Sequence, residues 1–257
     1  MPEDQVKKLR RKITVSRYVA IASVVFALLL VAATGVTAAE KGKKAEKPAE
    51  AAKAELTTQP AYLDKEHAPK GKGWIALCNG KDLTGWKFFP EKAANSWKVV
   101  DGILVSAFKQ GEHGTNIYTQ KKFGDFELYY EYCVPKGGNS GVFLRGQYEI
   151  QILDDHGVPA DNPKDWGNGG IYGEKAPSKN MSKPAGEWQS GYVKMVGNKI
   201  TVFINGEKVI DNFTPPGATY LHDELKTKDG EPSGPIVLQG DHRPIKFRHV
   251  MIKPIKK

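Results

Sequence analysis

Apolar and polar residues alternate along much of the chain after residue 74. Runs such as Phe126–Cys133 and Lys199–Ile204 place apolar side chains at every second position, and Gly, Asn, Asp or Pro interrupts the runs. Because successive side chains of a strand point to opposite faces, this alternation predicts half-buried β-strands. Asp101-Gly102 and Asn205-Gly206 are dipeptides favoured in two-residue hairpin turns, where both residues need a positive φ.

The predicted strands follow one another with no amphipathic helix of ordinary length in 74–257. About 185 residues of this kind exceed an immunoglobulin domain and favour an all-β fold, a two-sheet jelly-roll sandwich. The segment from His156 to Gly186 breaks the alternation and is predicted to be a long surface loop, a kind of loop that often carries function. The predicted strands are Trp74–Cys78, Trp97–Val100, Ile103–Ser106, Asn116–Thr119, Phe126–Cys133, Val142–Arg145, Glu149–Leu153, Trp188–Val196, Lys199–Ile204, Glu207–Asp211, Ile236–Gln239 and Lys246–Ile252.

One predicted hairpin, within residues 139–155, separates apolar from reactive polar side chains. A two-residue loop would mix the two kinds on both faces, whereas a three-residue loop over 146–148 leaves Arg145, Glu149 and Gln151 together on one face. In that register Arg145 pairs with Glu149, and Phe143 pairs with Gln151. The polar face is then either a solvated surface with a weak cross-strand ion pair or a functional surface. The apolar face comprises Val142, Leu144, Ile150 and Ile152.

The N-terminal residues differ from the rest. Residues 1–17 are basic, and Tyr18–Ala39 is an uncharged, mostly apolar run that ends in small residues. This predicts a signal peptide over 1–39, cleaved after Ala38 or Ala39, and the alternative is an uncleaved membrane anchor. In both cases the rest of the chain faces an extracytoplasmic space, periplasmic or secreted. Residues 40–72 are rich in Ala, Lys, Glu and Pro and are predicted to be a linker, which leaves 73–257 as the folded domain.

The formal net charge of +9 does not indicate a nucleic-acid partner. Residues 1–39 hold six basic and two acidic side chains, so the remainder carries +5, with lysines interleaved among acids. There is no arginine-rich helix and no zinc-ligand spacing. Cys78 and Cys133 are either a disulfide or two free thiols, since the sequence does not show their separation.

The ordered motifs of the domain resemble a known family. It was once called DUF1080 and is described as the 3-keto-disaccharide hydrolase, or 3-keto-glucoside 1,2-lyase/3-keto-2-hydroxy-glucal hydratase, domain. Its fold is similar to the concanavalin A-like lectin/glucanase jelly roll, and the resemblance covers essentially all of 74–257. The motifs are Leu77-Cys-Asn-Gly-Lys-Asp-Leu-Thr-Gly-Trp86, Trp97-Lys-Val-Val-Asp-Gly102, Phe123-Gly-Asp-Phe-Glu-Leu128, Asn139-Ser-Gly-Val-Phe-Leu-Arg145, Tyr148-Glu-Ile-Gln-Ile-Leu-Asp154, Gly170-Ile-Tyr172, Gly186-Glu-Trp188, Asn205-Gly206, Gly234-Pro-Ile-Val-Leu-Gln239 and Phe247-Arg248.

The resemblance implies cleavage of a glycoside whose C3 hydroxyl another enzyme, an upstream oxidase, has converted to a ketone. The ketone acidifies the C2 proton, so a base can form an enolate that expels the group on C1. We expect Glu149 to be the base and Arg145 or His242 to lie near the enolate oxygen. Because a neighbouring arginine lowers the pKa of a carboxyl, the alternative is that Glu149 orients Arg145 while His242 or Glu187 moves the proton. The expected substrate-binding residues are Gln151, Tyr172, Asn139, Trp188, Gln239 and Asp154.

Two other functions remain open at this stage. A conventional glycosidase of the same fold would need a second carboxyl beside Glu149, and Asp154 is the candidate, although its strand parity is opposite. A non-catalytic sugar-binding module would present aromatic side chains such as Trp166, Tyr172 and Trp188. We expect no cofactor and no structural metal, while a weakly held divalent cation stays open.

Overall fold

The computed structural model describes residues 69, 72–109, 112–218, 225, 227 and 231–256. The predicted signal peptide or anchor over 1–39, and all of the predicted linker except residues 69 and 72, lie outside the described residues. The described part has no helix with the length and hydropathy of a membrane span.

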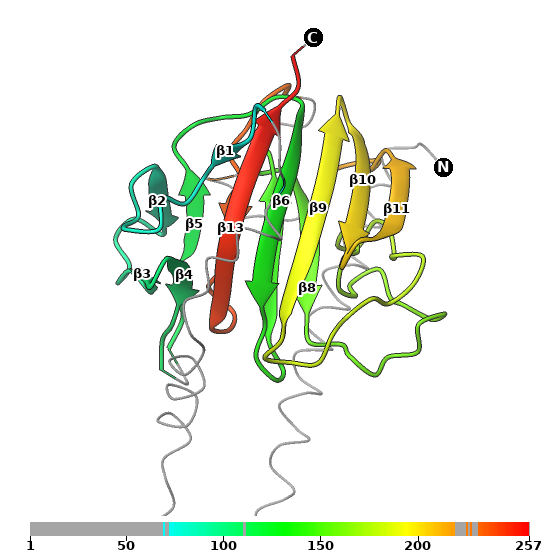
Figure 1. Ribbon diagram of the computed structural model, residues 1–257, viewed down its shortest axis with the longest axis horizontal. Helices are drawn as coiled ribbons and strands as arrows, with labels where there is room; N and C mark the ends of the chain where they lie inside the picture. The colour runs from blue at the N-terminus through cyan, green and yellow to red at the C-terminus, as the bar shows by residue number, and fades with distance from the viewer. Residues whose placement is uncertain are drawn as a thin grey trace, which may run out of the picture. The chain divides into compact units, whose positions relative to one another are not determined.

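Two antiparallel sheets make up the described part of the domain, in agreement with the predicted sandwich (Figure 1). The larger sheet has the order β11-β10-β9-β6-β13-β4-β3, with β1 paired to β13, and the smaller has the order β2-β5-β12-β7-β8. The strands are β1 (Ile75–Ala76), β2 (Trp86–Phe89), β3 (Trp97–Val100), β4 (Ile103–Ser106), β5 (Asn116–Thr119), β6 (Phe126–Cys133), β7 (Asn139–Leu144), β8 (Tyr148–Leu153), β9 (Trp188–Val196), β10 (Lys199–Ile204), β11 (Glu207–Phe213), β12 (Val237–Leu238) and β13 (Ile245–Pro254).

Alternation along the strands builds the main core between the sheets. On β6 the side chains of Phe126, Leu128 and Tyr130 are buried in that core, whereas Glu127 and Tyr129 between them are only partly buried. The smaller sheet supplies the facing apolar residues from β5, β7, β8 and β12. The alternation in the sequence therefore predicted which side chains of each strand face the core, because successive side chains of a strand point to opposite faces.

Six predicted strands have the observed bounds, among them β6 and β9. Both predicted hairpin turns are confirmed, since Asp101, Gly102, Asn205 and Gly206 all have positive φ. The prediction missed β2, whose sequence Trp-Lys-Phe-Phe does not alternate cleanly. The reason is that this strand has apolar residues on both faces: some of them pack in the main core, while Phe89 packs in a separate cluster.

The register of the β7–β8 hairpin differs from the prediction. The pairs are Leu144 with Tyr148 and Phe143 with Glu149, so the loop consists of residues 145–147. Arg145 has a φ of 55° and lies in the turn rather than in the strand, and the N–H of Gln147 donates to the carbonyl of Leu144 at 2.9 Å. The predicted pairing of Arg145 with Glu149 is therefore wrong. The predicted faces hold for the strand residues, because both loops contain three residues and preserve the parity of the strands, but Arg145 does not share the face of Glu149 and Gln151.

The long segment after β8 is irregular, as predicted, but part of it continues the smaller sheet. Ile171 is fully buried and forms an antiparallel bridge with Ile150 of β8. Asp155 organises the segment: it accepts a hydrogen bond from the hydroxyl of Ser182, and its Oδ2 accepts the N–H of Asn168 at 2.9 Å. These bonds fix where the segment crosses the edge strand.

Both cysteines are free thiols. Cys78 is half-buried and Cys133 is buried, where its Sγ donates to the carbonyl of Gly186 at 3.2 Å. Of the two alternatives left by the sequence, the structure therefore has the pair of free thiols.

Candidate active site

The outer face of the smaller sheet carries side chains that do not belong to the main core. Phe143 and Val237 are buried there in a second apolar cluster with Leu225. Cross-strand pairing aligns one row over four strands, which consists of Tyr118, Val237, Phe143 and Glu149. Glu149 therefore stands at the end of an apolar row, on the face opposite the core.

The carboxyl of Glu149 lies over Gly141 of the neighbouring strand. A Cβ atom at Gly141 would collide with Oε1 of Glu149, so the missing side chain makes room for the carboxyl. Gly141 pairs with Gln151 on one side, and on the other its carbonyl accepts the N–H of Gln239 at 2.9 Å. The carboxyl is thus placed between two glutamine positions, and Glu149 is only 5% exposed.

Burial changes the acidity of Glu149. Loss of hydration raises its pKa from 4.5 to about 8, and the nearby charge of Asp241 contributes in the same direction. A carboxyl with this pKa is mostly protonated at pH 7 and, when ionised, is a much stronger base than an ordinary glutamate. The concern that Arg145 would weaken this base does not arise, because Arg145 has other partners.

Asp241 and His242 follow β12, which lies inside the smaller sheet between β5 and β7. Nδ1 of His242 lies 2.6 Å from Oδ1 of Asp241, and this hydrogen bond raises the pKa of His242. Asn116 supports the loop: its Nδ2 donates to Asp241 at 3.3 Å, and its Oδ1 accepts the N–H of Gly240 at 2.9 Å. The sequence analysis named His242 but missed Asp241, although a carboxyl directly beside a histidine is a recognisable signal.

Amide groups flank the carboxyl of Glu149. Nε2 of Gln151 donates to Oδ1 of Asn139 at 3.3 Å. The main-chain carbonyl of Gln239 accepts the hydroxyl of Ser140 at 2.8 Å. Among the described residues, Oε1 of Gln151 and Oε1 of Gln239 are buried without a hydrogen-bond partner. Since buried acceptors rarely stay unpaired, these two atoms are suited to a ligand that brings hydroxyl donors.

The loop after β8 brings the backbone of Tyr172 beside β8, the edge strand of the smaller sheet. Its N–H donates to the carbonyl of Glu149 at 3.0 Å, directly after the buried Ile171. Six predicted site residues therefore lie on or beside the smaller sheet. They are Glu149, Gln151, Asn139, Gln239, Tyr172 and His242.

The structure does not bring Arg145 to this group. Its Nη2 forms an ion pair with Oδ1 of Asp125 at 2.8 Å, and its Nε donates to the carbonyl of Gly124 at 2.9 Å. The side chain is 1% exposed. The positive φ at Arg145 ends the alternation of β7, so the side chain leaves the face that Glu149 occupies.

Three further predicted site residues have other surroundings in the structure. Glu187 is an exposed residue directly before β9, and Trp188 is the first residue of β9, which belongs to the larger sheet. The ring of Trp188 packs under the guanidinium of Arg248 at 4.3 Å. Asp154 points to the loop before β7, where its Oδ2 accepts the N–H of Gly137 at 2.8 Å.

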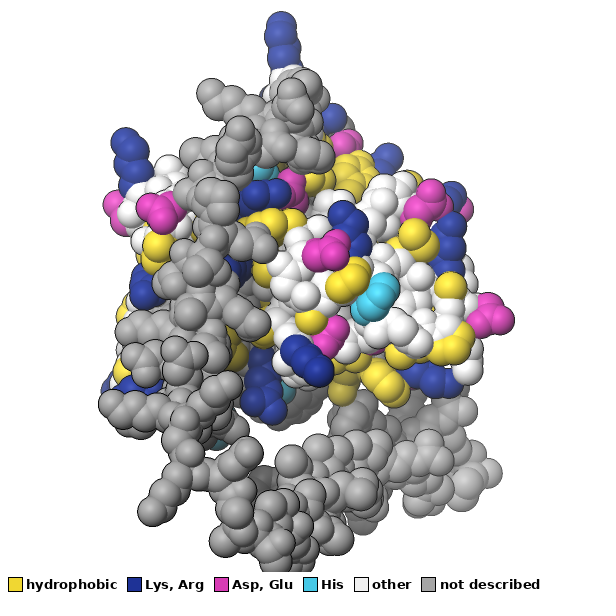
Figure 2. All heavy atoms as spheres, turned by 60° about the horizontal axis from the view of Figure 1, so that its bottom comes forward, with side chains coloured by type: hydrophobic (Ala, Val, Ile, Leu, Met, Phe, Trp, Pro, Cys, Tyr) yellow, Lys and Arg dark blue, Asp and Glu magenta, His cyan; other side chains and the backbone are white. Residues whose placement is uncertain are grey.

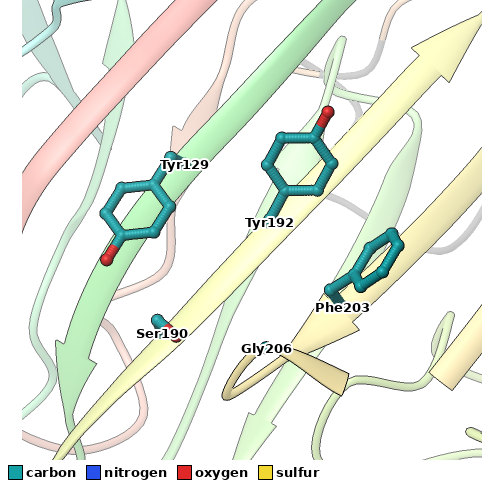
Figure 3. A pocket seen from close by; sticks show the side chains of 5 residues that line it. All are labelled: Tyr129, Ser190, Tyr192, Phe203 and Gly206. Atoms are coloured by element: carbon teal, nitrogen blue, oxygen red, sulfur yellow. The ribbon is translucent and has the colours of Figure 1, made fainter. Parts of the chain in front are cut away.

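The larger sheet has a hollow of its own on its outer face, about 280 Å³ in volume (Figure 3). Beside it Glu131 is buried. Although burial alone would raise its pKa, hydrogen bonds from His249, Tyr129 and Arg248 lower it to about 2. This buried network therefore holds an ionised carboxyl and stiffens the sheet. The hollow is lined by Tyr129, Ser190, Tyr192, Phe203 and Gly206.

Charges of both signs are interspersed over the face of the molecule in Figure 2. In the described part of the chain, no three His, Cys, Asp or Glu side chains lie close enough to hold a metal ion. The absence of a nucleic-acid partner, of a cofactor and of a metal remain predictions.

The candidate site thus combines a buried carboxyl, a histidine–aspartate pair and two unpaired amide oxygens on one sheet of an all-β sandwich. The chain belongs to the family of the 3-keto-alpha-glucoside-1,2-lyase-like domain, whose model matches residues 73–253. The resemblance read from the motifs is therefore confirmed.

Relatives agree with this assignment. A 3-keto-disaccharide hydrolase from Bacteroides thetaiotaomicron is 25% identical over 184 residues, which cover 59% of this chain and 62% of the relative. The chain thus spans about three fifths of the curated relative's length. A solved candidate glycosyl hydrolase from Parabacteroides distasonis is 30% identical, with a TM-score of 0.57, over 72% of this chain and 84% of that chain. A second one from that organism, 24% identical over 72% and 95% of the two chains with a TM-score of 0.57, shares the fold.

Proposed function

We propose that the protein cleaves the glycosidic bond of 3-keto-glycosides in an extracytoplasmic space, after an upstream oxidase has made the ketone. The observation that carries this proposal is the buried carboxyl of Glu149 with its raised pKa, beside the unpaired side-chain oxygens of Gln151 and Gln239. The family assignment and the name of the Bacteroides relative support it.

In this mechanism the ionised form of Glu149 removes the proton from C2. The C–H electron pair moves into an enolate with its charge on the C3 oxygen, and collapse of the enolate breaks the bond from C1 to the leaving oxygen. The proton taken from C2 balances the proton that the leaving alcohol needs. A desolvated carboxyl suits this step because its basicity is matched to a weakly acidic carbon.

The enolate oxygen needs a hydrogen-bond donor or a cation, and His242 takes that role in place of Arg145. Its hydrogen bond to Asp241 raises its pKa and so favours the protonated ring. Gln151 and Gln239 then accept hydroxyl protons of the sugar through their unpaired Oε1 atoms. Addition of water to the unsaturated product would make the overall reaction a hydrolysis.

The test uses matched pairs of glycosides, one with a 3-ketone and one without, and follows product release by NMR in deuterated water. We expect cleavage of the keto member alone, with deuterium at C2, and loss of cleavage in Glu149→Gln. Glu207→Gln is the matched control, because Glu207 is an exposed carboxyl on the larger sheet. Saturable binding of unoxidised sugar without any cleavage would instead assign a sugar-binding module.

The electrostatic contact between Glu149 and Asp241 favours one second candidate, a conventional glycosidase. Such an enzyme needs two carboxyls around the scissile bond, and Asp241 supplies the partner that Asp154 does not. Cleavage of the unoxidised member of each pair, lost in Asp241→Asn, would support this reaction over elimination.

A further inference from the structure

Arg145 lies in the turn of the β7–β8 hairpin and not on the outer face of the smaller sheet that carries Glu149, which we call the active face. The same turn also contacts Leu225 and Thr227. The carbonyl of Arg145 accepts a hydrogen bond from the hydroxyl of Thr227 at 2.7 Å. A Cβ atom at Gly146 would lie 2.6 Å from the carbonyl of Leu225, so only a glycine allows this close approach. The two contacts hold Leu225 and Thr227 at the tip of the β7–β8 hairpin.

The tip itself is fixed by a buried charge pair. Nε of Arg145 donates to the carbonyl of Gly124, and its Nη2 donates to Oδ1 of Asp125. The same Oδ1 also accepts the N–H of Gly197 at 2.9 Å. The arginine is almost fully buried, so its pairing is not screened by water. A buried charge with several partners has one stable position, and the backbone of the turn is held with it.

Leu225, at the other end of these contacts, covers the active face. Its side chain packs in one cluster with Phe143 and Val237, and it is 8% exposed. Phe143 is the cross-strand neighbour of Glu149 on the same face. Leu225 therefore covers the residue directly beside the site carboxyl.

We propose that Arg145 is a positioning residue, which acts through Thr227 to hold Leu225 over Phe143 and thereby keeps water away from Glu149. This inference rests on the role proposed above for Glu149. In this inference Arg145 does not contact the substrate; it helps to hold Leu225 and Phe143, which lie beside Glu149.

The test measures the accessibility of Glu149 in the absence of substrate, by carbodiimide-driven labelling of carboxyl groups and mass spectrometry of the full chain. Thr227→Val removes the hydroxyl that binds the Arg145 carbonyl, and Leu225→Ala removes the covering side chain. We expect labelling of Glu149 to rise about tenfold in both variants, on the scale of one lost hydrogen bond or side-chain contact. Thr201→Val is the control, since its hydroxyl bonds the Asn212 N–H on the larger sheet.

Kinetics distinguish positioning from a general loss of structure. In both variants kcat on a 3-keto-glycoside should fall while KM stays near that of the wild type, and for Thr227→Val the melting temperature should also stay near that of the wild type. The double variant Arg145→Met/Asp125→Asn removes the charge pair without leaving a lone buried charge, and it should show the same labelling. Unchanged labelling of Glu149 in all three variants would overturn the inference. Failure of the wild type to cleave any 3-keto-glycoside would sink the proposed function instead, and the labelling result would still stand.

Discussion

The buried carboxyl of Glu149 should cost the protein stability at neutral pH. Its pKa is about 8 in the folded chain against an ordinary value of 4.5. Between these two values the unfolded chain releases the proton and the folded chain keeps it, so stability falls as pH rises. The full stability is present below the unfolded pKa and is lost as pH approaches the folded pKa. Glu149→Gln removes this loss, because glutamine does not titrate.

The size of the effect follows from the two pKa values. Each pKa unit corresponds to about 1.36 kcal/mol, so the wild type loses about 3 kcal/mol by pH 7 and about 5 kcal/mol above pH 8. These are order-of-magnitude values for a carboxyl that is 5% exposed. Glu149→Gln should therefore gain stability over the wild type progressively between pH 4 and pH 8, while losing cleavage.

Urea unfolding of the wild type and of Glu149→Gln at several pH values from 4 to 9 measures this directly. At each pH the measured quantity is the difference in free energy of unfolding between Glu149→Gln and the wild type. Subtracting its value at pH 4 from its value at pH 8 cancels any contribution of the substitution that does not depend on pH. Glu187→Gln serves as the control, since that side chain is exposed. If the difference in free energy of unfolding between wild type and Glu149→Gln is the same at pH 4 and pH 8, the argument that burial raises the pKa of Glu149 is refuted.

Three further predictions concern the surroundings of the site. Gly141→Ala should displace the site carboxyl, with at least about a tenfold loss of kcat measured on 3-keto-glycosides, because its Cβ would occupy the position of the carboxyl. Asp241→Asn should lower the pKa of His242, which NMR titration of the ring protons would show as a shift of the midpoint to lower pH. Arg248→Met should destabilise the fold by about 3 kcal/mol in urea unfolding, because it removes a charged partner from the buried Glu131.

The sequence alone identified much of the active face. Glu149 and Gln151 share a strand parity that is opposite to that of Ile150, and parity is a local property of any extended chain. Asn139 was expected only from the family resemblance, because the predicted strand began at Val142, and the histidine in Gln239-Gly-Asp-His242 was recognisable from its chemistry. Alternation and turn dipeptides therefore fixed the strands and the side of the hairpin that carries the chemistry.

Only the tertiary structure decided which of these residues meet. The place of Arg145 depends on a positive φ and on Asp125, twenty residues away. Sheet order placed Glu187 beside the larger sheet, because it directly precedes β9 and β9 pairs with β6 rather than with β8. The role of Asp241 depends on Asn116, 125 residues earlier. Alternation determines a face within one strand, but register, sheet order and the burial that shifts a pKa arise from contacts between distant segments.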